Sequence, residues 1–510
     1  MNTADVSRTT PPFLPGKRLA PQFLGMMLVY CAVVYAWMPQ LYPLGRDYAA
    51  MSSLESLPWL ARTLFAWELH RFGTWSYGYF LVNMLLLYAC MVTVFFCTRL
   101  VVRGLWWLGS LAAVLMMANP LKSEAVLHLS GVQDLLPAWL ALLALLFHAL
   151  HLRHRRWWIF PGALVVFALA VLPFRANQAL FLVIACMECV MVEKGNRLQI
   201  PVRLIPFFLL SLVAMGAQGI VWRTGLLTTP ASILPLWLVF YPIGLLPETA
   251  AWFYQFPILA ALAGLAIVFL IFGIHRLSRN AAMFGLALGA CAWCAWQSMQ
   301  SVDLVQMNGG GAMIVPMALL TMAFAALCGQ IQRLPKWRRP IVFLTTLLCA
   351  VFFVLQARSN LAWVHAGGQV RAFQEQIAEA AARHPGETFG VAPDYQYHLG
   401  APVRLSESVR YDTPIGPAIK VMSVLPINYV RSPALQVCVL EWSATEARIE
   451  VRGASPHALA PPPYLLTRPG IKQTISEVDV FLESAAVDSV IYRVRPTEGT
   501  LPLYRVEQAQ

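Results

Sequence analysis

The feature that most constrains this chain is a series of long apolar runs. A helix needs about twenty apolar residues to cross the hydrocarbon core of a bilayer. Charged residues make up only 12% of the 510 residues, about half of the fraction found in soluble domains. The sequence therefore predicts an integral membrane protein. We predict spans at 23–43, 77–98, 104–118, 135–151, 157–174, 178–192, 204–222, 257–274, 281–300, 311–330 and 340–357.

Basic residues give these spans their orientation. Lys and Arg gather before the first span and after the second, fourth, sixth, eighth and tenth spans, and cytoplasmic loops of membrane proteins carry such an excess. We therefore place residues 1–22 in the cytoplasm and the C-terminal region outside. This topology accounts for the net charge of +12, so we predict contact with membrane lipids and no binding of nucleic acid.

The segment 231–256 is the ambiguous part of this topology. Its first half is apolar enough to span, but a crossing there would move the basic residues at 275–279 and 333–339 to the outer side. Its prolines and aromatic residues suit a re-entrant or interfacial segment. Without this segment, the chain has about eleven spans.

Ionisable side chains interrupt the apolar pattern between the third and fourth spans. The stretch 119–136, NPLKSEAVLHLSGVQDLL, contains Lys122, Glu124, His128 and Asp134. Ionisable groups at membrane depth are costly and usually mark a functional site. The alternative is topological, because outer loops simply lack the cationic bias of inner loops. We favour a polar cavity on which the outer loops converge.

The first outer loop, 44–76, supplies a second polar feature. Asp47 follows the first span directly, within the sequence GRDY. Later in the loop, apolar residues recur at helical spacing and predict an amphipathic helix along the membrane surface. An Asp that faces a cavity can deprotonate an acceptor hydroxyl or bind a divalent cation. A capping or solvated Asp is the alternative.

The composition changes past residue 357. Residues 371–387 predict an amphipathic helix that ends near Pro385 and Gly386. The short alternating stretches that follow, among them VDVFL and VIYRV, are typical of strands. The predicted fold is thus a polytopic α-helical membrane protein with a C-terminal α/β or β-rich extracytoplasmic domain. Its parts are a cytoplasmic tail at 1–22, a transmembrane core at 23–357 and the outer domain at 358–510.

Two consecutive stretches resemble a known family. The sequence YGYFLVNMLLLYACMVTVFFCTRLV, followed by ANPLKSEAVLHLSGVQDLLPAWLALLALLFHAL, is similar to the membrane core of the GT-C superfamily of polytopic glycosyltransferases. The nearest branch is the tetratricopeptide-repeat O-mannosyltransferase-like proteins and their bacterial relatives. Their third and fourth spans are joined by a His-Pro, Glu-Ala-Val, Gly-x-x-Asp-Leu-Leu pattern. Here it stands as Asn119-Pro120, Glu124-Ala125-Val126 and Gly131-Val132-Gln133-Asp134-Leu135-Leu136.

The resemblance implies a reaction and a set of site residues. Such enzymes pass a sugar from a polyprenyl-phosphate carrier to an acceptor on the outer side of the membrane, usually with inversion. A carboxylate in the first outer loop serves as base, and Asp47 corresponds to it. Cations hold the lipid phosphate, and the candidates are Arg175, Lys122 and Arg223. The other residues expected to bind substrate are Arg46, Glu124, His128, Asp134 and Glu248, each with a structural ion pair as the alternative.

The chain also departs from the family pattern. The paired acids of the first loop are reduced to Asp47, the His before Pro120 is Asn119, and an expected Glu-Arg pair appears as NGGGAM at 308–313. The tetratricopeptide repeats are absent, so the acceptor is open among a glycolipid, a surface polysaccharide and a protein. We predict a glycosyltransferase of a bacterial inner membrane. The alternatives are a transporter or flippase for a lipid-linked glycan, which predicts internal symmetry, and a catalytically silent membrane scaffold.

Overall fold

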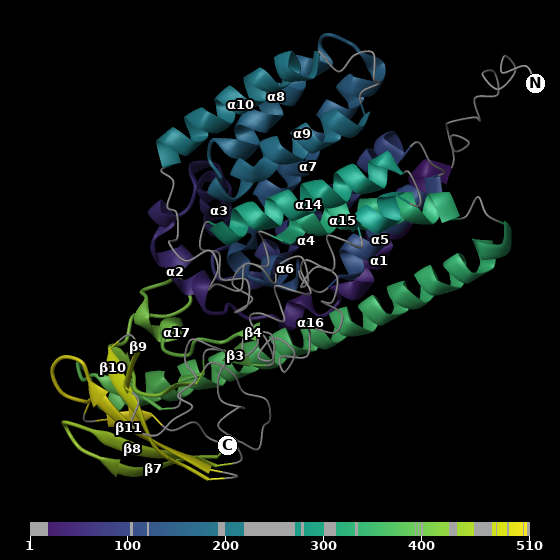
Figure 1. Ribbon diagram of the computed structural model, residues 1–510. Helices are drawn as coiled ribbons and strands as arrows, with labels where there is room; N and C mark the ends of the chain where they lie inside the picture. The colour runs from purple at the N-terminus through teal and green to yellow at the C-terminus, as the bar shows by residue number, and fades with distance from the viewer. Residues whose placement is uncertain are drawn as a thin grey trace, which may run out of the picture.

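The computed structural model describes two connected parts, a helical core and a group of sheets at one end of it (Figure 1). It describes residues 19–506 apart from 103–105, 120–121, 192–198, 219–270, 277–279, 300–312, 332–334, 393, 396, 399–400, 428–435, 453–471, 476, 487–488 and 503. The ambiguous segment 231–256 lies outside the described residues, as does most of the predicted span 257–274.

Helices occupy all the remaining predicted spans. The long apolar helices of the core are α1 (Leu19–Val34), α4 (Ser76–Val102), α5 (Trp106–Ala118), α7 (Val132–His154), α8 (Ile159–Val171), α9 (Leu180–Met191), α10 (Gln199–Gln218), α14 (Ala281–Met299), α15 (Ile314–Ile331) and α16 (Arg338–Arg383). Within the described residues, five helical stretches are long and apolar enough to cross a membrane: 76–102, 129–154, 199–218, 314–331 and 339–383. This is a polytopic helical membrane protein.

Helix α16 joins the two parts of the molecule. It has 46 residues and passes without a break through 357 and 358, where the sequence predicted the border between core and outer domain. The predicted amphipathic helix at 371–387 is its C-terminal portion, which ends at Arg383. Gly367 within it allows close contact with the first outer loop, because a Cβ at Gly367 would lie 3.0 Å from the Tyr42 side chain.

The first outer loop is largely helical. A short turn, η1 (Met38–Gln40), precedes the loop. The loop itself contains α2 (Arg46–Ser52), η2 (Leu54–Ser56) and α3 (Trp59–Phe72). Helix α3 lies where the sequence predicted a helix for this loop. Its fully buried residues are Ala61, Phe65 and Glu68, whereas Trp67 is half exposed.

The connection between α5 and α7 folds into two short turns, α6 (Ser123–Leu127) and η4 (Leu129–Gly131). Gly131 makes this compact fold possible. A Cβ at Gly131 would lie 2.0 Å from the carbonyl oxygen of Ala125 and 2.7 Å from Asn83 Nδ2, distances that no side chain tolerates. The glycine of the Gly-x-x-Asp-Leu-Leu pattern therefore has a steric reason.

The part of the chain that was predicted to lie outside the membrane, residues 358–510, keeps the name outer domain here and has two main sheets among its described residues. An antiparallel sheet has the order β7-β8-β11-β10-β9, and a parallel sheet has the order β12-β1-β5. Alternating apolar residues of the first sheet, among them Ile449, Val480 and Val494, form a separate small core. The strands are β1 (Phe389–Val391), β5 (Val421–Ser423), β7 (Gln436–Trp442), β8 (Ala447–Arg452), β9 (Lys472–Ile475), β10 (Val478–Ala485), β11 (Ser489–Pro496) and β12 (Tyr504–Val506), with short pairs β2 (Asp394–Tyr395) with β6 (Pro426–Ile427) and β3 (Tyr397–His398) with β4 (Ala401–Pro402).

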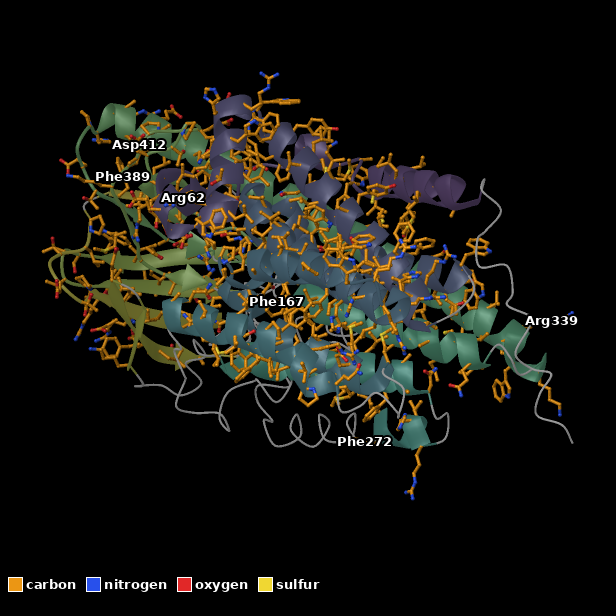
Figure 2. The ribbon with its side chains drawn as sticks, turned by 90° about the horizontal axis from the view of Figure 1, so that it is seen from above. Arg62, Phe167, Phe272, Arg339, Phe389 and Asp412 are labelled. Carbon is orange, nitrogen blue, oxygen red and sulfur yellow. The ribbon has the colours of Figure 1, made fainter. Side chains whose placement is uncertain are left out.

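The first outer loop and the outer domain lie at the same end of the molecule. Figure 2 shows Arg62 of α3, Phe389 and Asp412 at one end of the molecule, while Arg339, at the start of α16, lies at the opposite end. A short helix of the outer domain, α17 (Glu407–Arg410), packs against α2. The candidate site lies at this shared end.

Candidate functional site

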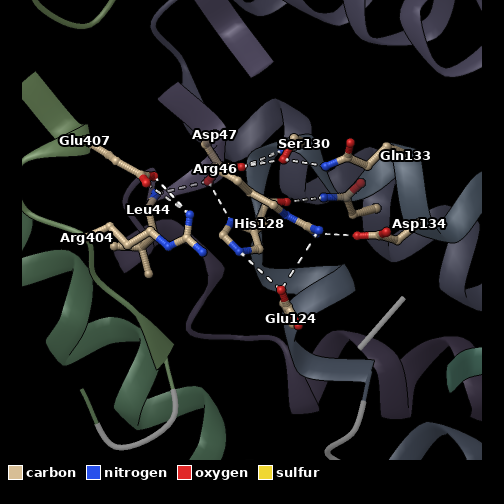
Figure 3. Close-up of polar contacts among 11 residues, drawn as sticks. Leu44, Arg46, Asp47, Glu124, His128, Ser130, Gln133, Asp134, Arg404 and Glu407 are labelled. Atoms are coloured by element: carbon tan, nitrogen blue, oxygen red, sulfur yellow. Dashed lines mark hydrogen bonds and ion pairs between the residues drawn. The ribbon is translucent and has the colours of Figure 1, made fainter. Parts of the chain in front are cut away.

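Asp47 is the centre of a buried polar cluster. It lies in the first turn of α2 and is inaccessible to solvent. One carboxylate oxygen accepts hydrogen bonds from the Ser130 backbone N–H at 2.9 Å and from the Ser130 hydroxyl at 2.7 Å. The other accepts from the Leu44 N–H at 3.0 Å, and His128 Nδ1 lies 3.1 Å from it. Asp47 thus joins the first outer loop to the connection between α5 and α7 (Figure 3).

Arg46 extends the cluster toward solvent. Its guanidinium forms an ion pair with Asp134 and lies 3.9 Å from Glu124. The Arg46 and Asp134 side chains are 25% and 19% exposed, whereas Glu124 is buried. The cluster therefore has a partly solvent-exposed edge at Arg46 and Asp134, called the wet edge below, and a buried interior at Asp47. A substrate would first meet the wet edge.

His128 connects the carboxylates of this interior. Its Nε2 atom lies 4.0 Å from Glu124, on the side opposite to Asp47, and its ring meets Trp363 of α16 edge-on at 4.9 Å. Burial lowers the pKa of His128, although Asp47 opposes this. The imidazole is thus neutral near pH 7, and the nitrogen that faces Asp47 carries the proton because a carboxylate only accepts.

The charge state of Asp47 follows from its contacts. Burial alone would raise its pKa, but the nearby His128 and the hydrogen bonds to the carboxylate outweigh burial and hold the pKa at about 2. Hydrogen bonds to the charged form of a carboxylate have this effect. Asp47 is therefore an anion at every physiological pH, and all its present donors come from the protein.

The local backbone explains why these groups meet. Asn83 of α4 donates to the carbonyl of His128 at 2.7 Å and to that of Val126 at 3.4 Å. These bonds satisfy carbonyls that the turn between α6 and η4 leaves without helical partners. Asn83 and Gly131 together hold Ser130 against Asp47. Two residues far apart from each other in sequence thus support the turn that binds the carboxylate.

Lys122 does not join this cluster. Its ammonium is fully buried and donates to the Asn119 carbonyl and to Gln356 of α16, each at 2.8 Å. It also lies over the ring of Tyr35, 5.8 Å from its centre. Burial lowers the pKa of Lys122 to about 7. These contacts link Lys122 to α16 and to Tyr35, and phosphate binding by Lys122 stays a prediction.

Arg175 lies close to the first turns of α7 but not within the cluster around Asp47. It opens η5 (Arg175–Ala179), and Asn177 of this turn donates to the carbonyl of Pro137 in the first turns of α7 at 2.9 Å. Arg175 is therefore near the end of α7 that carries Asp134. Its Nε and Nη2 atoms are buried and have no hydrogen-bond partner among the described residues. The other two predicted residues, Arg223 and Glu248, lie outside the described residues.

The described residues hold no group of three or more His, Cys, Asp or Glu side chains arranged to bind a metal. The acids of the cluster contact Arg46 and His128 and do not converge on one point. The arrangement is that of a polar network with alternating charges. Such a network can orient a substrate hydroxyl and hold a cation in place.

Sequence reasoning missed several residues of this site. Ser130 provides two of the hydrogen bonds to Asp47, and Asn83 orders the turn, but neither stands out within its apolar surroundings. The proximity of Ser130 to the Gly-x-x-Asp-Leu-Leu pattern was the only available signal. The outer domain also reaches the cluster. Its Arg404 lies against Gly45, and Gln374 of α16 bonds to Tyr42, Tyr48 and Ser408.

Comparison with known proteins finds a likeness only at the level of structure. No family model and no curated protein matches this sequence. Among solved structures, the chain is similar to ArnT from Cupriavidus metallidurans bound to undecaprenyl phosphate. The two share 12% of aligned residues, over 93% of this chain and 97% of that chain, with a TM-score of 0.42. A likeness this distant does not by itself assign an activity.

Proposed function

We propose that this protein is a membrane glycosyltransferase that moves a sugar from a polyprenyl-phosphate donor to an acceptor at the outer surface of a bacterial inner membrane. One observation carries the proposal. The two outer-loop features that resemble the GT-C pattern, Asp47 and the stretch from Glu124 to Asp134, meet in one cluster. Two hydrogen bonds from Ser130 to Asp47, the His128–Asp47 contact and the ion pairs of Arg46 with Glu124 and Asp134 join the two features.

The reaction forms one bond and breaks one. The acceptor oxygen bonds to the anomeric carbon, and the bond from that carbon to the phosphate oxygen breaks. The lipid phosphate leaves with the bonding electrons, and the hydroxyl proton passes to a carboxylate of the protein and then to water. Phosphate is already a good leaving group, so positioning and neutralisation of charge supply most of the rate.

We assign the role of proton acceptor to Asp47. Its carboxylate is ionised and held at a fixed position, and loss of a present hydrogen bond would raise its pKa from about 2 and make it a stronger base. The acceptor hydroxyl must replace one present donor, and the Ser130 hydroxyl is the one that can rotate away. Ser130 also accepts a hydrogen bond from Gln133 at 3.3 Å. Asp134, at the wet edge, is the second candidate because it is already accessible.

We assign the binding of the donor phosphate to Arg175 and Arg46. The buried guanidinium nitrogens of Arg175 have unused donor capacity among the described residues, and a guanidinium matches a phosphate with paired hydrogen bonds. Arg46 faces the wet edge, where its ion pair with Asp134 can open. Glu124 then remains to orient the acceptor, which is a glycolipid, a surface polysaccharide or a protein.

The placement of charges supports the proposed topology. The basic start of α16, at Arg339, lies at the end of the molecule opposite to the first outer loop and the outer domain (Figure 2). An excess of cations marks the cytoplasmic side. We therefore assign the cluster around Asp47 to the periplasmic side and the N-terminus to the cytoplasm.

The Asp47→Asn variant tests this function. Lipid-linked sugars and surface glycans are profiled by mass spectrometry in a deletion strain that carries the wild-type gene, the Asp47→Asn gene or the Asp134→Asn gene. We expect the product missing from the deletion strain to return with the wild type and to stay at least a hundredfold lower with Asp47→Asn, as for loss of a general base.

The alternatives give different outcomes. A scaffold would restore the profile with either variant. A transporter would change the side on which a lipid-linked glycan accumulates, without changing which glycosidic bonds are present. Full restoration by Asp47→Asn together with loss in Asp134→Asn would move the base to Asp134. An unchanged profile in the deletion strain would refute the enzymatic function altogether.

A further inference from the structure

The outer domain reaches the cluster through one arginine. Arg404 lies directly against Gly45, the residue that precedes Arg46 and Asp47. A Cβ at Gly45 would be 3.2 Å from Arg404 Cδ, a tight contact that would require the arginine side chain to shift, and the φ of +45° at Gly45 also disfavours a side chain there. Figure 3 shows Arg404 and its partner Glu407 on the side of the cluster that faces the outer domain.

The backbone at this contact is unusual on both sides. Gly45 has a φ of +45° and Arg404 a φ of +46°. Left-handed backbone is uncommon for arginine and persists only where the surroundings enforce it. Such positions are frequent at ligand-binding sites. The chain therefore accepts a strained residue at the point where the outer domain meets the first outer loop.

The surroundings of Arg404 hold it firmly. Val403 and Leu405, on either side, are fully buried and belong to the same hydrophobic core as the membrane helices. Buried Asp394 accepts hydrogen bonds from both the N–H and the hydroxyl of Ser406, at 3.1 and 2.6 Å. The backbone that carries Arg404 is thus fixed from both directions, and its side chain is positioned before any substrate arrives.

A single glutamine fixes this segment to the first outer loop. Gln374 of α16 accepts a hydrogen bond from the Tyr42 hydroxyl at 2.7 Å and donates to the Tyr48 hydroxyl at 3.1 Å. It also donates to the carbonyl of Ser408 at 2.8 Å. Tyr42 and Tyr48 flank the segment that holds Arg46 and Asp47, and Ser408 follows Arg404 by four residues. The distance between the two segments is therefore set by the protein.

Binding of a phosphate at the cluster needs a cation in addition to Arg46 and Lys122, which already contact protein groups. Asp134 and Glu124 already surround Arg46, and Lys122 is committed to Gln356 and the Asn119 carbonyl. Arg404 forms an ion pair with Glu407, at 3.1 Å, in which both side chains are about a quarter exposed. The pair is therefore within reach of solvent, and the phosphate monoester of a polyprenyl phosphate, with a charge of about −1.5 to −2 near pH 7, can displace the singly charged Glu407.

We propose that Arg404 is a substrate-binding residue of the membrane-core site and that it binds the phosphate of a polyprenyl-phosphate ligand after release from Glu407. The proposal rests on the proposed function and adds the outer domain to its active site. Glu407 then acts as an internal competitor that occupies the guanidinium until a phosphate arrives. It follows that removal of Glu407 strengthens binding of the ligand, whereas removal of Arg404 weakens it.

The test uses the full-length protein in nanodiscs of zwitterionic lipid. Binding of polyprenyl phosphate is measured by native mass spectrometry for the wild type, Arg404→Ala and Glu407→Gln. We expect about ten- to a hundredfold weaker binding for Arg404→Ala, the range for lost hydrogen bonds to a charged group. We expect up to about fivefold tighter binding for Glu407→Gln, the range for a surface pair. Arg410→Ala is the matched control, because Arg410 lies in α17 but pairs with Glu477.

Each other outcome overturns a defined statement. Equal binding by the wild type and both variants refutes the role of Arg404 but leaves the proposed function intact, provided that the wild type binds. Absence of binding by the wild type, together with absence of transferred sugar, refutes both. If Arg404→Ala does not fold, Glu407→Gln decides alone, since a purely structural pair predicts no gain in affinity. Inorganic phosphate must compete less well in Arg404→Ala than in the wild type; equal competition also refutes the role.

Discussion

Glu68 provides a sharp test of the packing around the first outer loop. It lies in α3 and is fully buried, and neither of its carboxylate oxygens has a hydrogen-bond partner among the described residues. Burial raises the pKa of Glu68 to about 8, so the side chain is protonated at neutral pH. We predict that Glu68→Gln, which has the same shape without the charge, removes a pH dependence of stability.

The magnitude follows from the pKa. An ordinary glutamate has a pKa near 4.5, and each tenfold change in proton affinity corresponds to about 1.4 kcal/mol. Between these two values the folded protein binds more protons than the unfolded chain, so stability falls as the pH rises from about 4.5 to about 8. The total cost of ionising Glu68 in the folded protein is therefore about 5 kcal/mol, reached above about pH 8.

The assay is thermal unfolding of the purified protein in detergent from about pH 5 to about pH 9. The difference in Tm between Glu68→Gln and the wild type should be near zero at the acidic end and should grow steadily with pH. Other titrating groups contribute equally to both proteins and cancel in this difference. Glu55→Gln is the control, because Glu55 lies in the same loop but is exposed. Parallel curves for Glu68→Gln and the wild type would refute the burial of an uncharged Glu68.

Two further predictions concern the helical core. Gly131→Ala should prevent the turn around Ser130, because its Cβ would lie 2.0 Å from the Ala125 carbonyl oxygen; sugar transfer should fall below detection, whereas Gly368→Ala, at an open position in α16, should retain it. Glu188→Gln should lower the free energy of unfolding by about 3–5 kcal/mol, since Arg203, 3.0 Å away, would lose its buried partner. An unchanged Tm would show that this pair is not buried in the membrane.

The predictable part of the fold is the part with a local cause. The run 77–98 lies within α4 (Ser76–Val102) and the run 311–330 lies over α15 (Ile314–Ile331), because length and apolarity alone decide whether a helix can cross a membrane. The stretch from Glu124 to Asp134 was equally visible, since its charges stand between apolar runs. The convergence of the outer loops on one polar region was predicted from their ionisable residues, and the hydrogen bonds from Ser130 to Asp47 give that convergence a geometry.

The remaining part depends on contacts between distant segments. Lys122 donates to Gln356, which lies 234 positions away in sequence, and no local pattern predicts that these two side chains meet. The same holds for Gln374 and Arg404, which come from a helix and a domain that the sequence separates from the core. Polar residues are informative from sequence when they stand against an apolar background, and they lose that contrast in a domain of ordinary composition.

The length of α16 explains how such distant residues come together. A helix of 46 residues is about 69 Å long at 1.5 Å per residue, whereas the hydrocarbon core of a bilayer is about 30 Å thick. Even at a tilt of about 40°, about 30 Å of α16 must therefore extend beyond the hydrocarbon. That extension carries Gln374 past the first outer loop and holds the segment of Arg404 over Gly45. Because the helix is continuous, the outer domain cannot move away from the cluster without bending α16 or breaking the bonds of Gln374, and the site is therefore built from both parts of the chain.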